Sequence, residues 1–138
     1  LTKEVIDNLN EKKYDFTVLN FAAPDMMGHT GDLTAGIKCC DKVDWYLGEI
    51  VKEYLKVNGT ILVTADHGNI EEMINLKTGE IDTEHSTNQV PFILVNKSLG
   101  NKIKLREKGK LSDIAPTILE LLKIKKPKEM TGKSLMIK

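Results

Sequence analysis

The chain has 138 residues, and its 20 lysine and arginine residues balance 20 aspartate and glutamate residues, so the formal net charge is zero. That length suffices for one ordinary domain with a real core, and the lack of a basic excess argues against a nucleic-acid partner. Apolar runs are too short to span a membrane, and the polar start at Leu1 and Thr2 is unlike a signal peptide. We therefore expect a cytoplasmic protein whose adjacent cysteines, Cys39 and Cys40, are reduced, with at least one buried on a helix.

The first third of the chain predicts a helix, a strand and a loop in that order. Apolar residues at helical spacing favour a helix over residues 1–12. A short apolar and β-branched run favours a buried strand over residues 16–21. Pro24 and Gly28 then predict that the chain continues as a loop.

The middle of the chain predicts a long helix followed by the second strand. The spacing of apolar residues indicates an amphipathic helix over residues 32–57, which Asn58 and Gly59 bring to an end. Residues 61–64 are apolar and β-branched and predict a second buried strand. A short helix over residues 69–75 and a turn over residues 77–80 are expected to follow.

The last third predicts one more strand and one more helix. Residues 90–95 form a third apolar run of strand length. Ser112 or Asp113 can cap a final helix that has Pro116 in its first turn, where the missing N–H costs little. The residues of this helix that we expect to face the core are Ile114, Ile118, Leu119, Leu121 and Leu122. Alternating strands and helices predict an α/β domain with a mainly parallel sheet.

All three histidines lie in polar loops next to the predicted strands, and two of them have a nearby aspartate. Asp25 and His29 follow the first predicted strand, and Asp66 and His67 follow the second. Because the carboxyl ends of parallel strands share one edge of a sheet, both pairs should meet there. His85 precedes its strand and reaches the same edge only if residues 90–95 run antiparallel to the other two strands. Imidazole and carboxylate are common ligands of Zn²⁺ and Mn²⁺, so a metal site is predicted.

An activated nucleophile and an anion pocket are not evident from these residues. None of the serines follows a strand at the sharp turn that would expose its hydroxyl: Ser86, Ser98, Ser112 and Ser134. The single arginine, Arg106, lies far from the histidine motifs in a lysine-rich loop. Thr30 and Thr64 are near the predicted ligands, where hydrogen bonding to a ligand is the expected role.

Three motifs together resemble those of the cofactor-independent (2,3-bisphosphoglycerate-independent) phosphoglycerate mutases of the alkaline phosphatase superfamily. They are Pro-Asp-Met-Met-Gly-His-Thr-Gly from Pro24, Asp-His-Gly-Asn from Asp66, and His-Ser-Thr-Asn-Gln-Val-Pro-Phe from His85. The second motif alone would indicate only the superfamily, whereas the first narrows the resemblance to the mutases. The similarity continues through residues 111–119 and 130–135, so it covers the whole chain.

The resemblance implies a fold and an activity. The expected fold is α/β and alkaline-phosphatase-like, with three layers and a mainly parallel sheet that has one antiparallel strand and flanking helices. Residues 1–138 would be the carboxyl-terminal portion of a metal-dependent phosphatase or mutase domain. The parent enzyme would be a cytoplasmic monomer that interconverts 3-phosphoglycerate and 2-phosphoglycerate through a phosphoserine, without a nucleic-acid or membrane partner.

The resemblance also implies two Mn²⁺ ions in the parent enzyme, with Zn²⁺, Co²⁺ or Mg²⁺ as alternatives. Asp25, His29 and His85 would hold one ion, and Asp66 and His67 would be ligands of the second. The family completes the second site with an aspartate and the nucleophilic serine near the amino end of a longer enzyme, where the substrate pocket also lies. No residue of this chain matches either, so we expect it to bind about one ion and to be inactive by itself.

Several alternatives stay open at this stage. The chain is expected to be a cloned fragment, since its first helix starts abruptly without a methionine, but a truncated product or half of a split enzyme would have the same sequence. The parent could instead be another phosphatase of the superfamily or a phosphopentomutase. A third alternative is a stand-alone metal-binding module.

Overall fold

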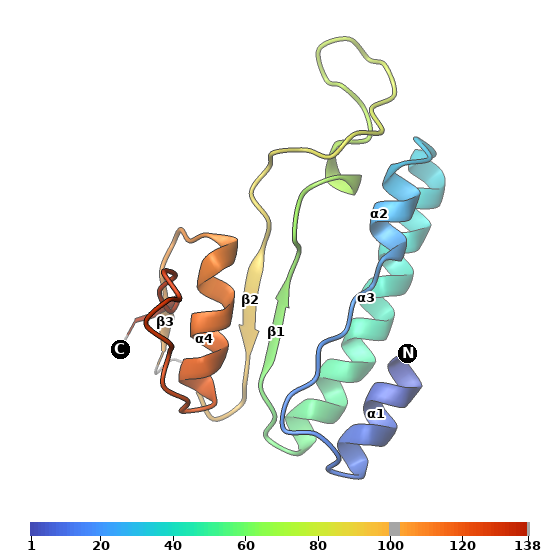
Figure 1. Ribbon diagram of the computed structural model, residues 1–138. Helices are drawn as coiled ribbons and strands as arrows, with labels where there is room; N and C mark the ends of the chain where they lie inside the picture. The colour runs from blue at the N-terminus through green and yellow to red at the C-terminus, as the bar shows by residue number, and fades with distance from the viewer. Residues whose placement is uncertain (100–102, 138) are drawn as a thin grey trace. The chain divides into compact units, whose positions relative to one another are not determined.

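A computed structural model describes residues 1–99 and 103–137, and the chain divides into two compact units, Leu1–Lys97 and Ser98–Lys138. The first unit contains helices α1 (Thr2–Asn10), α2 (Ala23–Gly28) and α3 (Leu33–Lys56), the 3-10 helix η1 (Ile70–Glu72), and strands β1 (Ile61–Thr64) and β2 (Phe92–Val95). In Figure 1, α1 and α2 both lie along α3, and each has contacts with it. The α/β class expected from the sequence therefore holds for this unit.

The long helix α3 confirms the prediction for residues 32–57. Asp32 is its N-cap, and the Asp32 carboxylate accepts a hydrogen bond from the Ala35 amide at 3.0 Å. Beyond the other end, Asn58 adopts a left-handed conformation with φ of 56°, a backbone geometry that stops helices. The buried face of α3 includes Gly36 and Ile50.

Strands β1 and β2 pair in antiparallel register, which confirms the predicted orientation of the third apolar run. Thr64, at the end of β1, pairs with Phe92, at the start of β2. The chain that leaves β1 and the chain that enters β2 therefore meet at the same end of this ribbon. This register brings residues 66–72 and 85–88 together.

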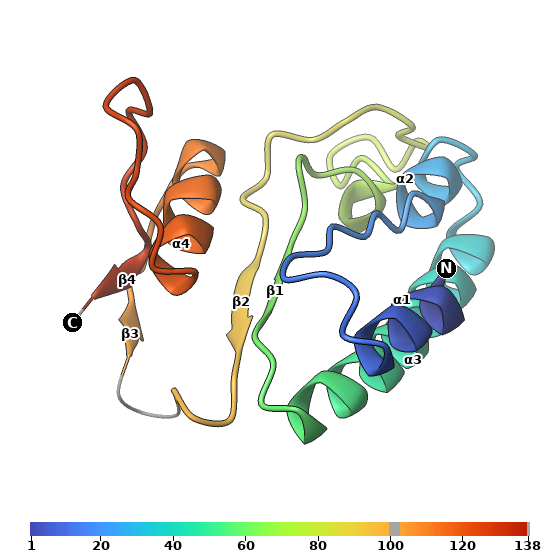
Figure 2. The same cartoon turned by 60° about the horizontal axis from the view of Figure 1, so that its bottom comes forward.

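The strand predicted over residues 16–21 is wrong. The segment is extended, but it forms no strand, and Phe16 and Val18 are 51% and 78% exposed. It passes between β1 and α3 in both views (Figures 1 and 2). A strand needs partners for its N–H and C=O groups, and this segment joins neither of the ladders found among the described residues. Both of those sheets are two-stranded and antiparallel, so the expected mainly parallel sheet is not present in them.

The loop predicted from Pro24 and Gly28 is instead the short helix α2. Pro24 lies in its first turn, where the missing N–H has no helical partner to lose, so the proline starts the helix instead of breaking it. The short helix expected over residues 69–75 is limited to the single 3-10 turn η1.

The second unit contains β3 (Lys104–Leu105), the 3-10 helix η3 (Leu111–Asp113), α4 (Ile114–Leu121) and β4 (Met136–Ile137), with β3 and β4 antiparallel. The final helix is confirmed. However, its buried residues are Pro116 and Thr117, whereas Leu122 from the expected apolar face is 39% exposed. The Thr117 hydroxyl donates to the Asp113 carbonyl oxygen and accepts from the Leu135 amide, so a polar bridge occupies the centre of this unit.

Few apolar side chains are buried in either unit. Those of the described residues are Ile50, Met73 and Leu135. Of the two free cysteines on α3, Cys39 is half-buried and Cys40 is exposed, so the prediction of a buried cysteine is wrong. No helix within residues 1–99 or 103–137 has both the length and the apolar character needed to cross a membrane.

Candidate metal centre

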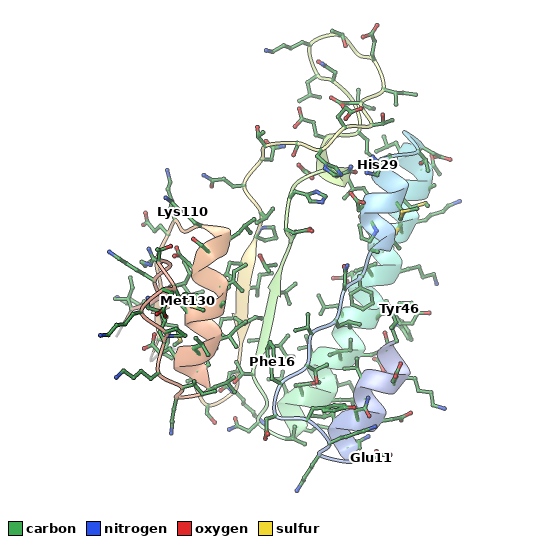
Figure 3. All side chains as sticks on the ribbon, viewed as in Figure 1. Glu11, Phe16, His29, Tyr46, Lys110 and Met130 are labelled. Carbon is green, nitrogen blue, oxygen red and sulfur yellow. The ribbon has the colours of Figure 1, made fainter. Side chains whose placement is uncertain are left out.

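A carboxylate and two imidazoles converge beside the end of α2. Asp25 lies in the first turn of this helix and His29 is its C-cap, so the spacing of four residues puts both side chains on one face. Figure 3 shows His29 at that end of α2, close to η1. His85 comes from the segment that precedes β2 and reaches the same point through the antiparallel pairing described above.

The three candidate ligand atoms form a compact triangle. The Asp25 Oδ1 atom lies 3.4 Å from His29 Nε2 and 3.3 Å from His85 Nε2. The two Nε2 atoms are 3.1 Å apart. Ligand atoms bound about 2.0–2.1 Å from one tetrahedral zinc ion would be roughly 3.3–3.4 Å apart. These donors therefore have the spacing of ligands that share one ion.

The Asp25 carboxylate supplies a second indication of a cation. Its Oδ1 atom is buried and accepts no hydrogen bond within the described part of the chain. A buried carboxylate oxygen without a donor is costly, and a bound cation would satisfy it. The three side chains are 39–49% exposed, so further ligands can reach an ion there from solvent or substrate.

A backbone carbonyl sets the tautomer of His29. The Nδ1–H group of His29 donates to the carbonyl oxygen of Thr83 at 2.7 Å. In a neutral imidazole, this leaves the lone pair on Nε2, which is the atom that faces Asp25 and His85. The hydrogen bond therefore both orients the ring and prepares the correct nitrogen for a metal ion.

The second predicted pair, Asp66 and His67, lies beside this triangle but does not close a site. The His67 ring stacks on His85 with 3.9 Å between ring centroids. His67 Nε2 is 3.7 Å from Asp66 Oδ2, and the Asp66 side chain is 89% exposed. Among the described residues, the triangle of Asp25, His29 and His85 is the group of acidic, histidine and cysteine side chains whose ligand atoms converge.

The polar residues around the triangle differ from those predicted. The Thr30 hydroxyl donates to the Met27 carbonyl oxygen and that of Thr64 to the Ala65 carbonyl oxygen, so neither bonds a predicted ligand. The residue that hydrogen-bonds a predicted ligand is Thr83, which accepts from His29 through its backbone carbonyl oxygen. Because any residue has this carbonyl, the sequence does not indicate the contact. The Ser86 hydroxyl donates to the Glu71 carboxylate, a contact that the sequence analysis missed.

Comparison with known proteins agrees with a metal-dependent site. The sequence profile of the Metalloenzyme superfamily matches residues 1–126. The 2,3-bisphosphoglycerate-independent phosphoglycerate mutase of Clostridium kluyveri is 52% identical over 99% of this chain and 26% of its own length. The similarly named enzyme 2 of Methanosarcina barkeri is 53% identical over all of this chain and 26% of its own length.

A solved structure agrees as well. The crystal structure of Leishmania mexicana phosphoglycerate mutase at low cobalt concentration superposes with a TM-score of 0.88 and 30% identity, over 99% of this chain and 27% of that one. The chain thus spans about a quarter of the length of the relatives it matches. Since the superfamily profile covers most of its residues, the chain belongs to the metalloenzyme superfamily and is homologous to part of the 2,3-bisphosphoglycerate-independent phosphoglycerate mutases.

Proposed function

We propose that Asp25, His29 and His85 bind one divalent cation, and that the chain is the carboxyl-terminal metal-binding part of a phosphoglycerate mutase. The observation that carries this proposal is the triangle of ligand atoms around the buried, unpartnered Asp25 Oδ1. The reaction proposed for the longer protein is interconversion of 3-phosphoglycerate and 2-phosphoglycerate, and the homologues named as phosphoglycerate mutases support it.

Each residue of the triangle has a separate task in this proposal. Asp25 contributes negative charge that offsets the charge of the cation. His29 offers Nε2 because Thr83 holds its other nitrogen, and His85 closes the triangle from the opposite segment. A bound divalent cation would stabilise charge on the oxygens of a phosphoryl group in transfer. Mn²⁺ is the proposed ion, with Zn²⁺, Co²⁺ and Mg²⁺ as alternatives.

The remaining parts of the reaction belong to a longer protein. Asp66 and His67 would contribute two ligands to a second ion, and the other ligands, the nucleophilic serine and the phosphoglycerate pocket would come from outside this chain. We infer a cytoplasmic, monomeric enzyme with a three-layer, mainly parallel sheet of the alkaline-phosphatase type. The large apolar side chains left exposed here, including Trp45 at 60% and Val18 at 78%, support burial against further polypeptide.

Calorimetric titration with Mn²⁺ and Zn²⁺ tests the metal site. The wild-type chain should bind about one ion tightly, because residues 1–99 and 103–137 contain one converging three-ligand set. His85→Ala should abolish tight binding, whereas His67→Ala, the matched control, should retain most of it. Equal losses in the two variants, or two tight ions in the wild type, would contradict this division of ligands. A substrate screen of the longer protein would separate a mutase from a phosphopentomutase or phosphatase.

A further inference from the structure

The Glu71 carboxylate joins the two segments that carry His67 and His85. Its Oε2 atom accepts a hydrogen bond from the Asn69 amide at 2.7 Å, within the segment that follows β1. Its Oε1 atom accepts from the Ser86 hydroxyl and from the Asn88 side chain at 3.1 Å, in the segment that leads to β2. One side chain therefore bridges the two segments at the end of the ribbon.

A backbone hydrogen bond next to Glu71 holds the two segments close together. The Ser86 amide donates to the Gly68 carbonyl oxygen at 2.8 Å, and these residues form an isolated antiparallel bridge. A side chain at Gly68 would collide here, because an ideal Cβ would lie 2.1 Å from Ser86 Oγ and 2.4 Å from Glu71 Oε1. The glycine thus permits the close approach of the Glu71 carboxylate and the Ser86 hydroxyl.

A local capping role explains only half of these contacts. An acidic residue in the first turn of a helix commonly accepts from free amides there, and the contact of Oε2 with Asn69 fits that role. The donors to Oε1 come from the other segment, 15 and 17 residues away, and have no part in capping η1. Burial would raise the pKa of Glu71, but hydrogen bonds from Ser86, from its own amide, from Asn88 and from Asn69 lower it to about 2. The acceptor is therefore charged under all physiological conditions.

We propose that Glu71 is a positioning residue that holds His85 in its metal-binding orientation, chiefly by anchoring Ser86. Glu71 shares Asn88 with Glu72, which accepts from the same side-chain nitrogen at 2.8 Å. His85 is adjacent to the anchored Ser86. The imidazole ring of His67 stacks on one face of the His85 ring. The proposal rests on the metal site proposed above and adds a residue whose carboxylate is hydrogen-bonded to Asn69, Ser86 and Asn88. Loss of a hydrogen bond made directly to a metal ligand commonly lowers metal affinity about 10–100-fold, so loss of an anchor one residue away from His85 should cost about tenfold, the lower end of that range.

Titration of the 138-residue chain with Co²⁺, followed by visible absorption, measures both affinity and ligand geometry. Glu71→Ala should weaken Co²⁺ binding about tenfold and change the absorption spectrum of the bound ion. Glu71→Gln, which keeps one acceptor oxygen, should recover part of the affinity. Glu80→Gln removes the same charge from an exposed position and should bind like the wild type.

Ser86→Ala tests the same anchor from the opposite segment. It should weaken Co²⁺ binding as well, and combining it with Glu71→Ala should cost less than the sum of the two single effects, because both remove one contact. Thermal unfolding without metal serves as the folding control. If Glu71→Ala lowers that midpoint, Ser86→Ala decides, and wild-type affinity in that variant overturns the proposal.

The outcomes separate the two proposals. A wild-type chain that binds no Co²⁺ overturns the metal site itself. A wild type that binds Co²⁺, together with Glu71→Ala of equal affinity and spectrum, overturns the role of Glu71 alone. An equal loss of Co²⁺ affinity in Glu80→Gln also overturns the role of Glu71, because the loss would then come from the change in net charge.

Discussion

The imidazole of His29 has one nitrogen free for an ion, because the other donates its proton to the Thr83 carbonyl oxygen at 2.7 Å. A backbone carbonyl cannot donate in return, so it fixes the tautomer as well as the angle of the ring. No side chain at position 83 can change this directly, since the acceptor belongs to the backbone. At this scale, the availability of His29 Nε2 depends on the path of the backbone around residue 83.

Substitution of Gly28 measures how closely this residue packs against its neighbours beside the metal site. An ideal Cβ at Gly28 would lie 1.4 Å from Oδ1 of the buried Asn69, so Gly28→Ala should lower the free energy of unfolding by about 1–3 kcal/mol. Gly48 is the matched control, because it is an exposed residue inside α3 and no atom would contact its Cβ within 4 Å. Gly48→Ala should raise the unfolding free energy by about 0.5–1 kcal/mol. Urea titrations of both variants measure these changes, and a neutral Gly28→Ala would show that Asn69 can move freely.

Among the elements, those with a strong local signal were predictable from the sequence. The long helix α3 combines an apolar stripe, an N-cap at Asp32 and a stop at Asn58, and each of these acts within one or two turns. The grouping of Asp25, His29 and His85 is implied by the family resemblance, whereas the geometric argument for it assumes a parallel strand over residues 16–21 that the described residues do not form. The segment at 16–21 shows the limit, because apolar composition does not reveal whether a neighbouring strand is available to pair with it. Pro24 shows a second limit of prediction from sequence, since a proline can begin a helix as well as end one.

Asp113 lies where η3 meets α4, and its carboxylate should make the free energy of unfolding of the second unit fall at low pH. Hydrogen bonds from the Lys133 amide, the Lys110 amide and the Arg106 side chain outweigh the effect of burial and lower the pKa of Asp113. A lowered pKa in the folded state means that the stabilisation is complete above the ordinary aspartate value of about 3.9 and is lost as the pH falls below it.

Asp113→Asn should therefore be less stable than the wild type at pH 7, and the difference should shrink as the pH approaches 2. The amide can still accept a hydrogen bond, but it cannot form the ion pair with Arg106. Urea unfolding at a series of pH values gives the two profiles. Glu107→Gln, at an exposed position of the same unit, is the charge-matched control. Parallel profiles for the wild type and Asp113→Asn would contradict this account.

The whole molecule has a nearly complete site for one ion on a scaffold that buries few apolar side chains. Catalysis also requires a nucleophile, and the nucleophilic serine that the family resemblance implies has no match in this chain. Metal binding and phosphoryl transfer should therefore separate experimentally.

An enolase-coupled assay with 3-phosphoglycerate and excess Mn²⁺ measures that separation. The 138-residue chain should show no turnover even when calorimetry shows that an ion is bound. The full-length Clostridium kluyveri enzyme, assayed in parallel, provides the positive control. Turnover by the chain alone near typical enzyme rates, roughly 1–10³ s⁻¹, would contradict its assignment as a metal-binding part.

The distance along the chain between His29 and His85 has a consequence for biosynthesis. The two rings meet although 56 positions separate them in the sequence. A ribosome adds about 5–20 residues per second, so His85 is made roughly 3–11 s after His29. During that interval only two members of the triangle, Asp25 and His29, have been synthesised. The proposed triangle is therefore complete only once His85 has been synthesised, shortly before β2.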